Sequence, residues 1–187
     1  TVAGLMNKIA NDLRMLASGP RNGLGEIEQP ENQPGSSIMP GKINPVVAES
    51  VNQVHKQVIG NDATVAAGAA RGEIDLNLYK PVLAHNFLQS ASLIANSAEV
   101  FGERFVGKLE ANADHCEKAV EQSMALATAL NPAIGYDSAS KVAKKALAEG
   151  KTVREVAVGE GYLSEAEADE VLDPRAMTER VILGADE

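Results

Sequence analysis

Apolar side chains recur at alternating steps of four and three residues along three long stretches of the chain. The recurring positions are Val2, Met6, Ile9, Leu13 and Leu16 in the first stretch, Val47, Val51, Val54, Val58, Asn61 and Val65 in the second, and Leu83, Phe87, Ser90, Ile94, Ser97, Phe101 and Phe105 in the third. A period of about 3.5 residues held this long predicts long helices packed nearly parallel in a left-handed bundle. None of the stretches has the two-residue alternation of a β-strand. The expected fold class is therefore all-α.

Residues typical of helix ends lie between these stretches. Asn44 followed by Pro45 predicts a helix start with Asn44 as its cap, and Arg71-Gly72 predicts the end of that helix. Lys80-Pro81 opens the next helix, and Asn112 is expected to cap a further one. The buried side of that further helix is expected to comprise Cys116, Val120, Met124, Ala127 and Leu130.

In the last third of the chain the spacing becomes that of three short helices. Asp137 can cap the first, while capping boxes formed by Thr152 with Glu155 and by Ser164 with Glu167 predict the other two starts. We therefore expect two parts, a portion of a central helical-bundle domain (1–130) and a small helical C-terminal domain (131–187).

Composition and charge narrow the range of partners. The chain has 187 residues with only three Tyr, three Phe and no Trp, so its core must be built from aliphatic side chains, which favours helix–helix contacts. A formal charge of −9 argues against nucleic acid or an anionic membrane as a partner, because both need clustered Lys and Arg. The single cysteine, Cys116, excludes a disulfide framework and a thiol zinc site. We expect no metal, no organic cofactor and no membrane span.

A long loop between the first two predicted helices holds the strongest candidate chemistry. Residues 19–45 contain five glycines, and four prolines precede Pro45. The loop ends in GSSIMPGKINP, where two hydroxyls follow a glycine and a lysine and an asparagine precede a helix. Free N–H groups at a helix start favour an anion, Lys42 adds a positive charge, and Asn44 adds a directional amide. This arrangement is that of a carboxylate-binding loop.

The residues also fit a role without chemistry. The Gly, Ser and Asn of the loop can serve turns and capping, and Glu49 suits the helix dipole in a first turn. His55, His85 and His115 lie in or near predicted helices, where structural or surface roles are the default. Cys116 falls on an apolar stripe and is expected to pack. Composition and spacing leave both interpretations of the loop open.

The loop closely resembles the signature of the fumarase/aspartase superfamily in its run GSSIMPGKINP. The similarity extends to NDLRMLASGPR and GLGEIEQPENQPG upstream and to NLYKPV, TALNPAIGYD, GYLSEAEAD and DPRAM downstream. The details resemble class II fumarases, because aspartases typically have Ala at the position of Gly41, an acidic residue at that of Lys80 and a different run after Leu130 to Pro132. The resemblance implies the reversible dehydration of (S)-malate to fumarate, a citric acid cycle reaction. The alternative is aspartate ammonia-lyase or another lyase of the superfamily.

The resemblance also implies roles for six residues. Ser36 is expected to be the general base that removes a proton from malate C3, and Glu49 is expected to orient a catalytic histidine. The substrate carboxylates are expected to contact Ser37, Lys42, Asn44 and the backbone of Ile43. Position 43 is commonly Val in the family, a departure that leaves every polar role in place.

The resemblance further implies a cytoplasmic homotetramer with active sites shared between subunits. In the family, the histidine segment and another substrate-binding segment precede the part that begins at Thr1. The chain starts inside an amphipathic helix without an initiator Met, so we expect a portion of a longer protein that is inactive alone.

The charge and the spacing also bear on two other functions. A helix-turn-helix reader in residues 131–187 is disfavoured, because seven Lys and Arg stand against twelve Asp and Glu there, a net charge of −5. A purely structural helical scaffold fits the heptads but leaves the loop sequence unexplained.

Overall fold

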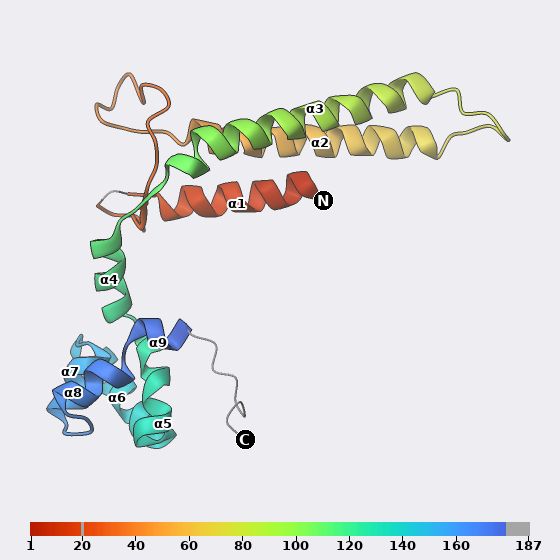
Figure 1. Cartoon of the computed structure of the whole chain (residues 1–187). Coiled ribbons are helices and arrows are strands. Elements are labelled where there is room, and N and C mark those ends of the chain that lie inside the picture. The colour runs from red at the N-terminus through yellow and green to blue at the C-terminus, as the bar shows by residue number, and fades with distance from the viewer. Residues whose placement is uncertain (20, 179–187) are drawn as a thin grey trace. The chain divides into compact units, whose positions relative to one another are not determined.

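A computed structural model describes residues 1–19 and 21–178 of the chain (Figure 1). The chain divides into two compact units, residues 1–112 and 113–187, and each is described here by itself. Both are predominantly helical, which confirms the predicted all-α fold class. None of the described helices combines the length and the apolarity needed to cross a bilayer.

Three long helices form the body of the first unit. Helix α1 (Val2–Leu16), α2 (Val46–Ala69) and α3 (Lys80–Arg104) run side by side (Figure 1). The predicted boundaries between α2 and α3 are confirmed, because α2 is capped at Ala70 and α3 opens with Pro81 in its first turn.

A short 3-10 turn, η1 (Val106–Lys108), and two short strands complete this unit. Strand β1 (Ile27–Glu28) pairs antiparallel with β2 (Glu110–Ala111), with Ile27 opposite Ala111. The pairing ties the loop after α1 to the segment after α3. Neither strand had a signal in the sequence pattern, because two residues are too few for an alternation to be visible.

The predicted apolar stripes are buried only in part. The buried core of the first unit comprises Ala10, Val47, Ala48, Val51, Phe101 and Phe105. The rings of Phe101 and Phe105 stack with their centroids 5.6 Å apart. On α1, Val2 and Ile9 of the periodic stripe are 57% and 49% exposed in this chain, while the smaller Ala3 and Ala10 are buried. Small side chains allow two helix backbones to approach closely.

The second unit is built from shorter helices. Its elements are α4 (Ala113–Glu121), η2 (Met124–Ala129), α5 (Leu130–Ile134), α6 (Tyr136–Glu149), α7 (Val153–Gly159), α8 (Glu165–Val171) and α9 (Pro174–Thr178). Leu126 and Leu130 are buried in one cluster with residues of α6, α7 and α8. The domain division at residue 131 stays a prediction.

The single helix expected after Asn112 was wrong. The chain breaks at Ser123, whose hydroxyl accepts a hydrogen bond from the Ala125 N–H and caps η2. Because the helix is interrupted there, the predicted apolar positions no longer lie on one helix face. Val120 is exposed, while Leu130 is completely buried. Serine favours such caps because its side chain competes with the helical backbone for hydrogen bonds.

Both predicted capping boxes are present. Thr152 accepts from the Glu155 N–H while Glu155 accepts from the Thr152 N–H, and Ser164 and Glu167 repeat the pattern. The cap expected at Asp137 was wrong, because α6 begins after Gly135, at φ 77°, and Asp137 lies in the first turn. Glycine adopts this backbone conformation without the steric cost of a Cβ.

One cation links three elements of the second unit. Arg154 at the start of α7 donates to Glu121 of α4 at 3.1 Å and to Asp169 of α8 at 2.6 Å. Partial burial lowers the pKa of the guanidinium, but the hydrogen bonds to Asp169 and Glu121 raise it above its ordinary value. Arg154 therefore stays charged and helps to hold α4, α7 and α8 together.

The capping box of α8 predicts a pH-dependent contribution to stability. The Glu167 carboxylate accepts from the Ser164 N–H at 2.8 Å and from its hydroxyl at 2.7 Å, and these bonds lower the pKa of Glu167. A lowered pKa stabilises the fold above the ordinary carboxyl value of 4.5, and this contribution is lost as pH falls through the folded-state pKa. We expect Glu167→Gln to lower the unfolding temperature at pH 7, with a gap that closes below pH 4.5 in circular-dichroism melts.

The control for this measurement is Glu170→Gln, on the same helix. Glu170 is exposed and outside the capping box, so its substitution should leave a small difference that does not vary with pH. A gap for Glu167→Gln that is equally large at pH 7 and pH 3 would contradict the assignment.

Candidate active site

The loop between α1 and α2 begins with a tightly bonded turn. The Gly25 N–H donates to the Ser18 carbonyl at 2.7 Å, and the Glu26 N–H donates to the Leu16 carbonyl at 2.9 Å. A Cβ at Gly23 would overlap the Ser18 carbonyl, so only glycine fits there. Asn112 then donates through its side chain to the Gly25 carbonyl at 3.1 Å. This first leg of the loop is therefore attached both to α1 and to the segment after α3.

The second part of the loop, which leads into α2, is narrowed at two points where two of its segments meet. We call these points the outer and the inner neck. At the outer neck, Gln29 Nε2 donates to the Ile43 carbonyl at 3.3 Å. At the inner neck, the backbone of Gly35 lies so close to the Lys42 carbonyl that a Cβ would overlap it. Gly41, at φ 78°, turns the chain back just before this neck. The residues between Gly35 and Lys42 thus form a short closed excursion that leads directly into α2.

Ser36 lies at the base of this excursion with its hydroxyl oxygen turned towards backbone donors. Its Oγ accepts from the N–H of Ile38 at 3.2 Å and from the N–H of Met39 at 3.3 Å. The residue is half-buried, whereas Ser37 beside it is exposed. Two N–H groups aimed at one oxygen favour negative charge on that oxygen.

The cationic and amide groups of the loop are available to a ligand. Lys42 is exposed and takes part in none of the ion pairs of the described ranges. Asn44 is half-buried, and within residues 1–19 and 21–178 no hydrogen bond uses its side-chain amide. The carbonyl of Ile43 is occupied by Gln29, while its N–H has no acceptor in the described structure.

The start of α2 differs from the prediction. Asn44 was expected to cap the helix, but Pro45 occupies the N-cap position and no side chain caps the helix. The Asn44 carbonyl instead accepts from the Val46 N–H at 2.9 Å. Because proline has no side-chain acceptor, the N–H groups in the first turn of α2 receive no side-chain cap within the described residues.

Glu49 is the acid of the first turn of α2. Its N–H donates to the Pro45 carbonyl at 2.9 Å, and its side chain is half-buried. It forms no ion pair with any residue of the described part of the chain. A carboxylate in this position can accept a hydrogen bond from a group that approaches the helix start.

The close approach of Gly35 to Lys42 and Ile43 places Ser36, the next residue after Gly35, at the inner neck, and Asn44 follows Ile43 along the chain. Among the described residues, no side-chain hydrogen bond or ion pair links these residues to Glu49, which stands one helical turn further on. Two hollows of about 480 and 220 Å³ lie along α2, and neither is lined by a predicted site residue.

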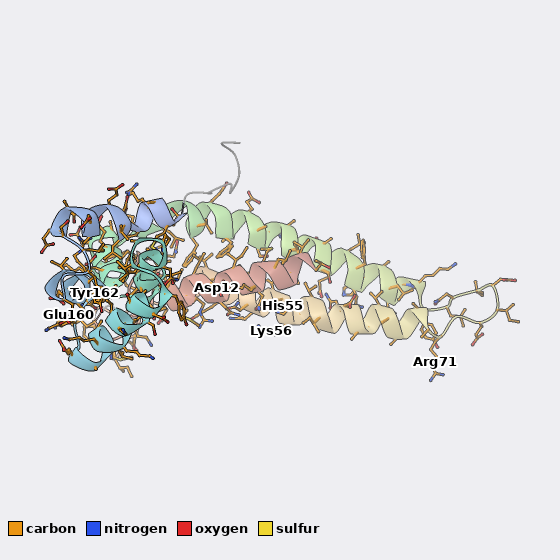
Figure 2. All side chains as sticks on the ribbon, turned by 90° about the horizontal axis from the view of Figure 1, so that it is seen from below. Asp12, His55, Lys56, Arg71, Glu160 and Tyr162 are labelled. Carbon is orange, nitrogen blue, oxygen red and sulfur yellow. The ribbon has the colours of Figure 1, made fainter. Side chains whose placement is uncertain are left out.

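The histidines lie outside the loop. His55 lies on α2 beside Lys56 (Figure 2), and within the described ranges its Nδ1 is buried without a hydrogen-bond partner. His85 lies on α3 and His115 on α4. Among the residues that the structure describes, no three His, Cys, Asp or Glu side chains are grouped as metal ligands.

The sequence pattern did not reveal which contacts close the loop. The glycines of the loop are suited to turns and to close backbone approach, and the structure shows that Gly35 makes such an approach, to the Lys42 carbonyl. Gln29 was not singled out, although its amide braces the end of the loop. The spacing of Gln29 from Ile43 carried no periodic signal, so only the folded backbone reveals the contact.

The sequence and the fold match proteins of known structure and family. A family model described as "Fumarase C C-terminus" matches residues 126–179, and one described as "Lyase" matches residues 1–60. The fumarate hydratase class II of Halobacterium salinarum is 78% identical over 174 residues, which are 93% of this chain and 37% of that relative. That of Oceanobacillus iheyensis is 51% identical over 177 residues, 95% of this chain and 38% of the relative.

Solved structures agree with this result. The fumarate lyase:delta crystallin from Brucella melitensis bound to cobalt superposes with a TM-score of 0.91 at 50% identity, covering 96% of this chain and 39% of that one. A recombinant class II fumarase from Schistosoma mansoni gives a TM-score of 0.86 at 38% identity, covering 94% and 36%. The chain thus spans less than two fifths of the length of these curated relatives, 37% and 38%.

The inner neck predicts that Gly35→Ala will open the loop. The added methyl group would overlap the Lys42 carbonyl, so the two chain segments that meet at the inner neck must move apart. We expect hydrogen exchange of the Ile38, Met39 and Lys42 amides to accelerate by about tenfold or more, measured by mass spectrometry on peptic fragments.

Gly60→Ala is the matched control. A Cβ at Gly60, inside α2, meets nothing within 4 Å, so this substitution should leave exchange in the loop unchanged and should stabilise the helix slightly. Equal exchange in the parent and in Gly35→Ala would show that the neck does not hold the loop.

Proposed function

Because this chain belongs to the class II fumarase family and corresponds to its C-terminal portion, we propose that it supplies the substrate loop of a fumarate hydratase. The reaction is the reversible dehydration of (S)-malate to fumarate. The observation that carries the proposal is the pair of backbone N–H groups on Ser36 Oγ, next to the available Lys42 and Asn44.

Ser36 acts in this proposal as the general base. A serine hydroxyl must first give its proton to a base outside this chain before its oxygen can accept one from malate C3, and the alkoxide is stabilised by the N–H groups of Ile38 and Met39 and by the positive charge of Lys42. The electron pair of the broken C3–H bond forms the C2–C3 double bond. The C2 hydroxyl leaves as water after it takes a proton from a group outside this chain.

The neighbouring donors stabilise the transition state. Proton removal next to a carboxylate places additional negative charge on the carboxylate oxygens, as in an aci-carboxylate. Lys42, the Asn44 amide and the Ile43 N–H are proposed to face those oxygens, with Ser37 as a further contact. Donors held in place before the reaction usually provide the largest electrostatic contribution to catalysis. The uncapped start of α2 adds to the attraction for the anion.

Glu49 is proposed to orient a catalytic histidine that belongs to another segment. Its half-buried carboxylate, without an ion-pair partner in the described part of this chain, is suited to accept a hydrogen bond from an imidazole N–H. Such a bond fixes the tautomer and direction of the ring.

The proposal is tested with a hybrid in which this chain replaces the matching part of the Halobacterium salinarum fumarate hydratase, 78% identical to it. We expect the hybrid to convert malate to fumarate and the isolated chain to be inactive. The reaction is measured by the absorbance of fumarate. Ser36→Ala should lower kcat/KM about 100-fold or more, and Lys42→Ala by a similar factor.

The matched control is Ser50→Ala, because Ser50 is an exposed serine on α2 whose hydroxyl donates to the Val46 carbonyl at 3.0 Å. The activity of the hybrid with Ser50→Ala should equal that of the unsubstituted hybrid. Turnover of aspartate in place of malate would identify the alternative lyase. Full activity of the Ser36→Ala variant would show that the general base does not lie in this loop.

The assembly is proposed to be a homotetramer whose active sites combine loops of different subunits. The support for the proposal is that many large apolar side chains of the long helices are exposed in the described residues, as expected for surfaces that other parts of an assembly cover. The large exposed apolar side chains of α1 and α3 include Val2, Leu5, Ile9, Met15, Phe87 and Leu88.

Phe87, on the predicted heptad stripe of α3, is 67% exposed and is proposed to be covered by a second subunit. We expect Phe87→Asp to raise the concentration at which the hybrid dissociates by about tenfold or more, measured by native mass spectrometry across a dilution series. Leu147→Asp is the control, because Leu147 is 74% exposed on α6. Identical dissociation of both variants would place the interface elsewhere.

A further inference from the structure

One polar residue interrupts the apolar face that α2 turns to α3. Asn61 is 3% exposed, as deeply buried as Val51. It occupies a heptad position whose other members on α2 are Val47, Val51, Val54, Val58 and Val65. A buried amide among valines needs partners, because an unsatisfied polar group in such a place is strongly unfavourable.

The Asn61 amide uses both of its ends. Its Nδ2 donates to Gln89 Oε1 at 2.9 Å and to Ser90 Oγ at 3.0 Å, both on α3. Its Oδ1 accepts from Gln57 Nε2 at 2.9 Å, one turn earlier on α2. Two of the three bonds therefore cross from α2 to α3 and exist only when these helices have one particular alignment.

The other contacts between α2 and α3 favour one alignment of the two helices only weakly. The other heptad positions of α2 are all valine, so a displacement by one helical turn would place similar side chains opposite α3. A solvent-open hollow of about 220 Å³ is lined by residues of both helices, among them Val54, Leu93 and Ser97, so it adds no contact there that would fix one alignment. At the turn, Asn77 donates to the Gly68 carbonyl at 3.1 Å, and Gly68 lies against Leu83.

The hydrogen bonds of Asn61 are not expected to contribute mainly to the free energy of unfolding. Gln57 and Gln89 are exposed and can bond to water, and Ser90 Oγ also donates to the Asn86 carbonyl at 2.9 Å. Replacing Asn61 by an apolar residue would therefore leave no buried group without a partner. The register of the two helices and the stability of the unit can thus be separated by experiment.

We infer that Asn61 is a positioning residue that sets the register of α2 against α3. It stands 15 residues beyond the first residue of α2, or roughly 22 Å along the axis, and the loop enters the helix at that end. A slip by one turn would move the loop and Glu49 by about 5.4 Å along α3. This inference is independent of the proposed function, since it concerns only the alignment of two helices.

The test measures the register directly by double electron–electron resonance. Spin labels are placed at Asp62→Cys on α2 and Glu99→Cys on α3, both exposed, in a Cys116→Ser background, and labelled protein is diluted with unlabelled protein. The parent should give one narrow distance distribution. Asn61→Leu should unfold at the same or a higher temperature, yet its minor-register population should rise about tenfold or more, seen as a broadened or second distance.

Asn61→Val, which only completes the valine stripe, is the second variant and should broaden the distribution in the same way. Val65→Leu, an apolar substitution on the same stripe, is the matched control and should keep the narrow distribution. A narrow, unchanged distribution in both Asn61 variants would overturn the inference and leave the turn at Gly68 as the element that sets the register.

Discussion

The burial of the first turns of α2 is the constraint on which the candidate site depends. Val47, Ala48 and Val51 are enclosed by Ala10 of α1 and by the stacked rings of Phe101 and Phe105. This small core fixes the helix start at which the loop ends. Because the loop has few apolar contacts of its own, its position follows from the elements at its two ends and from the hydrogen bonds at its necks.

Local donors, not the overall field, must attract a dicarboxylate to this protein. The chain carries a formal charge of −9, which repels an anion at long range. At the loop the situation is reversed, since Lys42 has no acidic partner in the described part of the chain and the start of α2 has no side-chain cap.

The second unit achieves its stability by other means. Its helices are short, so each depends on caps and on a shared buried cluster around Leu130, Val142 and Leu172. Arg154 adds bonds that join three of its helices. The first unit instead relies on three long helices, and many of their large apolar side chains are exposed in the described residues.

The sequence by itself determined the helical class, the boundaries of the long helices, the two capping boxes and the loop with its hydroxyl, ammonium and amide groups. These features are local, because heptad spacing, proline positions and capping pairs act within a few residues. The tertiary structure alone decided that Pro45 occupies the N-cap position of α2, that Gly35 and Gln29 close the loop, that α1 buries Ala3 and Ala10, and that the chain breaks at Ser123. Each of these depends on contacts between segments far apart in the chain or on the competition between alternative backbone hydrogen bonds, and neither leaves a periodic trace in the order of the residues.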